Sequence, residues 1–139
     1  MSESPAHALV TDESEAHEDY KRALIGAGEN GTVPSTCFDG FWPAAPHRAM
    51  RNSTFLAWDE AGRPAAGERP GDGDVVARMG DGIAIPHYHG DAARRHARAS
   101  ARRWRFCAGM GVAKVTELRP AGAAIEQLAA RLAERLNAR

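Results

Sequence analysis

Two histidines and an aspartate near the middle of the chain have the types and the spacing of metal ligands. The segment His87-Tyr88-His89-Gly90-Asp91 ends a stretch that we expect to be a β-strand. Alternate residues of a strand point to the same face, so His87 and His89 are expected to converge on one ion, with Asp91 or His96 as a further ligand. We therefore predict a metal site, with zinc as the candidate ion, at His87, His89, Asp91 and His96. The alternative is two polar residues at the end of a strand.

The same segment resembles known metal-binding motifs. It is similar to the His-x-His-x-Asp-His ligand motif of the metallo-β-lactamase fold, in which the motif lies where a strand meets a helix. The stretch Pro86-His87-x-His89 is also similar to the first motif of the cupins. The last histidine of the first motif is Ala92 in this chain, and the glutamate expected a few residues after the cupin histidines is absent. Both resemblances imply that His87 and His89 bind a metal.

A second cluster of candidate residues is basic. Residues 92–102 are rich in Ala and Arg, which are good helix formers, and Asp91 is a suitable cap. On such a helix Arg94, Arg98 and Arg102 would form one row. A row of guanidinium groups suits phosphate contacts, and the neighbouring aromatic ring suits base stacking. The alternative is a solvated helix face without a partner. The residues predicted to bind nucleic acid or an acidic partner are Arg94, Arg95, Arg98, Arg102, Arg103, Trp104 and Arg105.

Three further features of the sequence lead to predictions. Residues 26–31 match the dinucleotide pattern G-x-G-x-x-G, but no strand precedes them and no helix follows, so we expect a loop after a helix. Cys37 and Cys107 belong to no C-x-x-C pair, and we expect two half-buried thiols, with a single disulfide as the alternative. The aromatic side chains of residues 38, 41 and 42 are expected to anchor a loop to the core, with an exposed ligand-binding patch as the alternative.

The elements that must position these residues point to an α+β fold. We predict a single small domain over residues 13–139, in which antiparallel β-hairpins pack against two or three helices, and a mobile acidic tail over residues 1–12. The clearest hairpin surrounds Gly80-Asp81-Gly82. The apolar row Ile125, Leu128, Leu132 and Leu136 is expected to be buried against the sheet or a second subunit. The expected helices cover 13–25, 92–102 and 122–137, and the expected strands cover 53–58, 74–79, 83–89, 103–107 and 112–118.

Composition narrows the class of protein. Lys+Arg and Asp+Glu both number 18, so the net charge is zero and favours no partner. Leu, Ile, Val and Phe make up only 21 of 139 residues, and such a thin core favours a homo-oligomer or a partner. No apolar run approaches the length of a membrane helix, and the N-terminus lacks the basic start of a signal peptide, so we expect a cytoplasmic protein with no membrane partner.

These observations predict a function in broad terms only. The leading hypothesis is a small binding or accessory protein that acts on nucleic acid or on an acidic partner through the arginine-rich segment. The alternative is a metal-dependent protein or hydrolase that uses the histidine segment. Arginine outnumbers lysine 16 to 2, which is typical of GC-rich coding in a bacterium or its phage. Nothing near either cysteine in sequence activates its thiol as a nucleophile, so the sequence does not predict cysteine-based catalysis. Whether the protein is an enzyme stays open.

Overall fold

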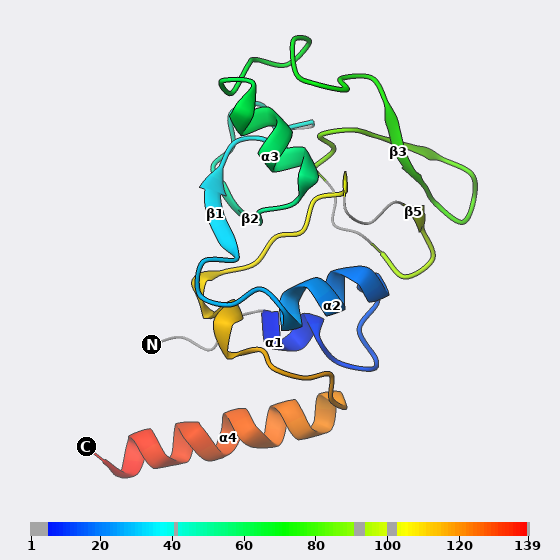
Figure 1. Ribbon diagram of the computed structural model, residues 1–139. Helices are drawn as coiled ribbons and strands as arrows, with labels where there is room; N and C mark the ends of the chain where they lie inside the picture. The colour runs from blue at the N-terminus through cyan, green and yellow to red at the C-terminus, as the bar shows by residue number, and fades with distance from the viewer. Residues whose placement is uncertain (1–5, 41, 91–93, 100–102, 139) are drawn as a thin grey trace.

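The computed structural model describes residues 6–40, 42–90, 94–99 and 103–138, and it confirms the predicted α+β class. Its short strands form two small antiparallel sheets, and the helices lie around them (Figure 1). The helices are α1 (Ala6–Leu9), α2 (Glu18–Ile25), α3 (Ser53–Glu60), the 3-10 helix η2 (Met110–Lys114) and α4 (Ala121–Asn137). The strands are β1 (Thr32–Ser35), β2 (His47–Met50), β3 (Val75–Arg78), β4 (Ala84–Pro86) and β5 (Arg98–Ala99).

The expected hairpin around Gly80-Asp81-Gly82 is present, but the rest of the sheet differs from the prediction. Strands β3 and β4 pair antiparallel, and β5 adds to the other edge of β3. Strands β1 and β2 form a separate two-stranded sheet rather than part of one larger sheet. The hairpin predicted from 103–107 and 112–118 is wrong, because residues 110–114 form η2 and residues 103–107 contribute only the single bridge between Cys107 and Ala49.

The segment predicted as a strand over 53–58 is the helix α3. Phe, Trp and Thr favour strands, but the residue before this segment acts as a helix cap. The Asn52 side chain accepts a hydrogen bond from the Phe55 backbone N–H at 3.0 Å. Thr54, Phe55 and Trp58 are buried, at a spacing that places them on one helical face. Local capping and this periodicity therefore override the strand propensity of the individual residues.

The helix predicted over 92–102 is also wrong for the part of it that the structure describes, residues 94–99. Arg98 and Ala99 pair with β3, and the Arg95 backbone N–H donates to the carbonyl oxygen of Glu15 at 2.7 Å. The open edge of β3 offers hydrogen-bond partners, and this tertiary pairing overrides the helix propensity of Ala and Arg. Residues 92, 93 and 100–102 lie outside the described residues.

The core consists of two clusters of buried side chains. The larger joins α1, α2, the three-stranded sheet and η2, and within it the Tyr20 ring stacks on Phe106 with the centroids 4.5 Å apart. The smaller lies under α3 and contains Cys37, Phe38, Ala49, Phe55, Trp58 and Tyr88. Residues 1–12 were predicted to form a mobile tail, but in the described part of that segment Ala6 and Val10 are both only 1% exposed.

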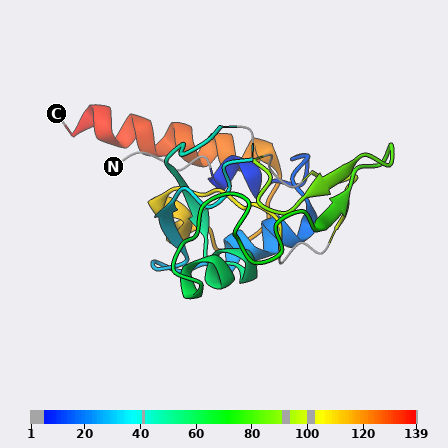
Figure 2. The ribbon, with the colours of Figure 1, turned by 90° about the horizontal axis from the view of Figure 1, so that it is seen from above.

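Helix α4 forms where the sequence predicts it, but its apolar row is not buried. Ile125, Leu128, Leu132 and Leu136 are between 47% and 66% exposed, and α4 buries no residue. The helix lies against the rest of the chain near its first turns and extends past it toward the C-terminus (Figures 1 and 2). Its start is held by a hydrogen bond from the Ala121 N–H to Glu13. Among the described residues, no helix is long and apolar enough to cross a membrane.

Candidate functional site

Two arginines lie directly opposite each other on the exposed face of the three-stranded sheet. Arg78 of β3 is the register partner of Arg98 of β5 on one side and of Ala84 of β4 on the other. Directly opposite residues of neighbouring antiparallel strands point to the same face, with their Cα atoms about 4.5–5.5 Å apart. Both arginines are exposed. The pairing therefore places two arginine residues next to each other on neighbouring strands, with the small residue Ala84 on the other side of Arg78.

This arginine pair is unfavourable for the isolated protein, because like charges directly opposite in a sheet repel each other. Arg78 donates a hydrogen bond to the carbonyl oxygen of Gly82 at 3.3 Å, which does not neutralise its charge. Among the ion pairs of the described residues, none involves Arg78, Arg98 or the exposed Arg94, whose backbone forms a single bridge with Ala16. An anion bound between the two guanidinium groups would remove the repulsion.

The other predicted arginines have structural roles or lie elsewhere. The Arg95 side chain donates to the carbonyl oxygens of Asp12 and Ser14 and so holds the N-terminal segment. Arg103 forms an ion pair with Asp74 at 3.1 Å. Arg105 lies away from the arginine pair and lines a separate pocket. Arg102 lies outside the described residues.

Trp104 does not offer a stacking surface, contrary to the sequence-based prediction. Its side chain is 1% exposed and belongs to the larger core cluster. Its carbonyl oxygen accepts a hydrogen bond from the Asn52 side chain at 2.6 Å. The aromatic residue next to the arginines in sequence is thus part of the core, and it fixes the segment that follows β5.

In the part of the chain that the structure describes, the predicted metal ligands do not form one cluster. Strand β4 ends at Pro86, and Tyr88 has a left-handed backbone with a φ of 63°, so the two-residue repeat that would aim His87 and His89 at one ion does not hold. His96 is exposed and lies 3.5 Å from Glu15. Within the described ranges there is no group of three His, Cys, Asp or Glu side chains that could hold a metal, and Asp91 lies outside them.

His87 instead takes part in a buried hydrogen-bond network. Its Nε2 lies 2.7 Å from the Thr54 hydroxyl and its Nδ1 lies 3.1 Å from the carbonyl oxygen of Gly71. Both ring nitrogens therefore have partners within the protein and neither offers a free lone pair to a metal. Burial lowers the pKa of His87, and the nearby Arg103 acts in the same direction. The network ties α3 to the end of β4, next to the three-stranded sheet.

The remaining sequence motifs correspond to a loop and to two free cysteines. Residues 26–31 form the expected loop between α2 and β1. Cys37 and Cys107 are both free thiols, the first buried and the second half-buried. Burial raises the pKa of Cys37 to about 12, so its thiol stays protonated and unreactive at neutral pH.

Sequence reasoning missed Arg78, which is the partner that defines the exposed pair. The residue lies in a strand that was predicted correctly, at the point where the hairpin turns. Nothing in the sequence indicates which residue of 92–102 would lie opposite it, because strand register between distant segments depends on the fold. The signal present in the sequence was that Arg78 and the segment 92–102 carry charge of the same sign.

Comparisons with known proteins inform the fold alone. The chain matches no protein-family model and no curated protein. Among solved structures it is similar to a FabK (M276A) mutant from Thermotoga maritima, with a TM-score of 0.59 and 17% sequence identity. The similarity covers 95% of this chain and 34% of the FabK chain, so this chain spans about a third of that protein's length. A similar fold therefore occurs as one part of a longer chain.

Proposed function

We propose that this protein is a nucleic-acid-binding module whose contact surface is the exposed face of the three-stranded sheet. The observation that carries the proposal is the cross-strand pair of Arg78 and Arg98. A guanidinium group donates two parallel hydrogen bonds to phosphate oxygens, so two neighbouring guanidinium groups suit one phosphate or two successive ones. Arg94, four residues before Arg98, is also exposed, and we include it in the proposed contact surface.

The surroundings of the pair support a nucleic acid rather than an acidic protein. Ile83 is 61% exposed in the turn between β3 and β4, and Val75 at the start of β3 is 49% exposed. The hairpin projects from the body of the protein (Figure 2), so a strand of nucleic acid can lie along it with its phosphates on the arginines. The exposed apolar side chains would then contact sugars or bases.

The proposal is tested by fluorescence anisotropy with labelled single-stranded and duplex oligonucleotides over a range of salt concentrations. Three phosphate contacts, from Arg78, Arg94 and Arg98, predict a log–log salt slope of about −2 for a single strand. The double variant Arg78→Gln/Arg98→Gln should bind more weakly and reduce the slope to about −0.7, because one contact remains. Polyglutamate should not compete.

A matched control removes an exposed arginine elsewhere. Arg63 is exposed, lies after α3 and is paired with Asp59 at 2.7 Å. Arg63→Gln removes one positive charge, as each replacement of the double variant does, and should leave the affinity and the slope unchanged. Binding that does not depend on salt, or equal losses in the control and in the Arg78 and Arg98 variants, would contradict the proposal. Binding of polyglutamate with the affinity of the oligonucleotide would indicate an acidic protein partner instead.

A further inference from the structure

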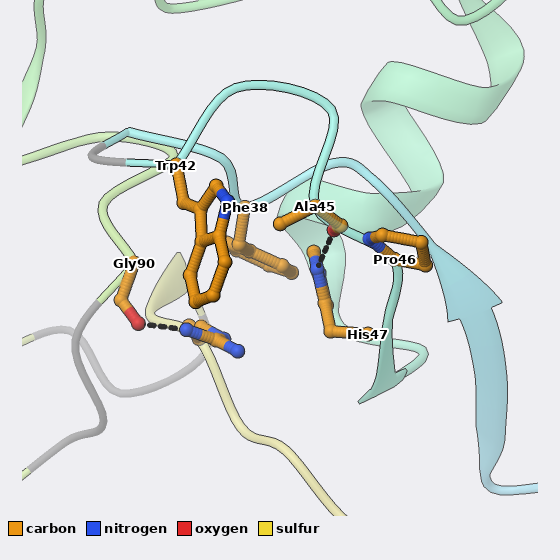
Figure 3. Close-up of a pocket in the computed structure, with 7 residues that line it drawn as sticks. Phe38, Trp42, Ala45, Pro46, His47 and Gly90 are labelled. Carbon is orange, nitrogen blue, oxygen red and sulfur yellow. Dashed lines mark hydrogen bonds between the residues drawn. The ribbon is translucent and has the colours of Figure 1, made fainter.

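A separate pocket lies on another part of the protein, between the loop before β2 and the segment after β5. It has a volume of about 490 Å³, which is within the range of small-molecule sites. Rings and apolar side chains form most of its lining (Figure 3). The residues that line the pocket are Phe38, Trp42, Ala45, Pro46, His47, Gly90 and Arg105.

Arg105 supplies the positive charge of this pocket in a fixed orientation. Its Nε–H donates to the sulfur of Cys107 at 2.8 Å, and its Nη1 donates to the carbonyl oxygen of Gly90, the bond drawn at Gly90 in Figure 3. Neither acceptor is a carboxylate, and no ion pair of the described residues involves Arg105. The guanidinium is therefore held in place with its charge uncompensated.

The other titratable groups near the pocket do not neutralise Arg105. Burial lowers the pKa of His47, whose Nδ1 lies 3.0 Å from the carbonyl oxygen of Ala45, so the ring is neutral at pH 7. The carboxylate of Asp39, which acts on the pKa of His47 in the opposite direction, forms an ion pair with Arg69 at 2.6 Å. Among the lining residues that the structure describes, Arg105 is therefore the one that carries a charge at pH 7.

Trp42 gives the pocket an exposed aromatic face. Its side chain is 77% exposed, although the backbone is held by hydrogen bonds from the Trp42 N–H to Asp39 and from the Ala45 N–H to Trp42. Phe38, by contrast, is 3% exposed and anchors the loop to the smaller core cluster. Figure 3 shows the Trp42 and Phe38 rings beside one another. One aromatic residue of the loop thus fixes it, and the other is available for stacking; residue 41 lies outside the described residues.

We infer that this pocket binds a small planar aromatic anion, with its ring on Trp42 and its anionic group on Arg105. The fixed guanidinium selects a carboxylate, a sulfonate or a phosphate, and the exposed indole selects an aromatic ring over a saturated one. This site is independent of the arginine pair on the sheet, because none of its lining residues belongs to β3, β4 or β5.

The inference is tested by isothermal titration calorimetry of the full chain at neutral pH with three probes. The first is 2-naphthoate, the second is 2-naphthamide, which has the same rings without the charge, and the third is cyclohexanecarboxylate, which has the charge without the aromatic ring. We expect one site for 2-naphthoate and affinities at least about tenfold lower for the other two, because each lacks one of the two interactions. Equal affinities for the acid and the amide would overturn the inference.

Two surface variants locate the site. Trp42→Ala removes an exposed side chain and should weaken 2-naphthoate binding about tenfold while leaving cyclohexanecarboxylate unchanged. The control Met110→Ala removes another exposed apolar side chain, which is 75% exposed and does not line the pocket, and it should bind like the wild type. Arg105→Gln should abolish the preference for the acid over the amide. Unchanged binding by Trp42→Ala, equal weakening by Met110→Ala, or no saturable binding at millimolar 2-naphthoate would each refute the site.

Discussion

Replacing Asn52 by alanine should lower the free energy of unfolding by about 2–3 kcal/mol, which is large for a half-buried polar residue. The side chain makes two contacts that alanine cannot make. Its Oδ1 accepts from the Phe55 N–H at 3.0 Å and caps α3, and its Nδ2 donates to the carbonyl oxygen of Trp104 at 2.6 Å. Loss of an N-cap costs about 1 kcal/mol, and a part-buried carbonyl left without its donor costs about 1–2 kcal/mol more.

The assay is urea unfolding followed by circular dichroism, with Asn30→Ala as the control. Asn30 is exposed and lies in the turn before β1, so its replacement should change the free energy of unfolding by less than about 0.5 kcal/mol. Asn52→Asp separates the two contacts, because aspartate still caps α3 but cannot donate to Trp104. It should therefore fall between the wild type and Asn52→Ala. If Asn52→Ala costs no more than Asn30→Ala, then residues 53–60 do not form a capped helix.

Three further predictions test burial and protonation. Because burial lowers the pKa of His87 from 6.5, the unfolded chain binds a proton more readily than the folded chain. The stability present above pH 6.5 should therefore fall as the pH drops below that value, which urea midpoints measured across this range would show. His87→Gln, but not His96→Gln, should make the fall shallower. Cys37 is fully buried, so a thiol-reactive disulfide reagent at pH 8 should label it only after unfolding, and rapid labelling of two thiols in the native protein would contradict this. Leu132→Gln on exposed α4 should cost less than about 0.5 kcal/mol, whereas Leu24→Ala in the core should cost about 2–4 kcal/mol, and a large loss for Leu132→Gln would show that the helix face is covered in solution.

The sequence predicted those elements whose signals are local. The hairpin from β3 to β4 has its glycines at the turn, and α4 has a long helical period after Pro120, so both form where expected. The strand predicted over 53–58 was wrong, because these residues favour strands individually, whereas the helix they form depends on one capping side chain and a buried face. The helix predicted for residues 94–99 was wrong, because pairing of Arg98 and Ala99 with the edge of β3, about twenty residues earlier, overrides the helix propensity of Ala and Arg.

The candidate site was less predictable than the fold. Arg98 was identified from its basic neighbourhood, but its significance depends on Arg78, and only the register between β3 and β5 brings the two together. Trp104 was chosen for its closeness in sequence to the arginines, but its side chain is buried. Among the described residues the exposed aromatic side chain is that of Trp42, which lines a separate pocket and lies more than fifty residues earlier in the chain. Local sequence indicates which residues are charged or aromatic, and the fold decides which of them face solvent together.

We propose that the sheet keeps two opposed arginines because an anionic nucleic-acid backbone compensates their repulsion. Thermal unfolding of the wild type and of Arg98→Glu, each with and without saturating oligonucleotide, tests this claim in one experiment. The variant replaces a repulsive cross-strand pair by an attractive one, so without oligonucleotide it should melt about 2 °C higher than the wild type. Oligonucleotide should then raise the midpoint of the wild type by several degrees and that of the variant by clearly less, because the variant binds more weakly. An Arg98→Glu protein that is less stable than the wild type, or that is stabilised by oligonucleotide as strongly as the wild type, would contradict the account.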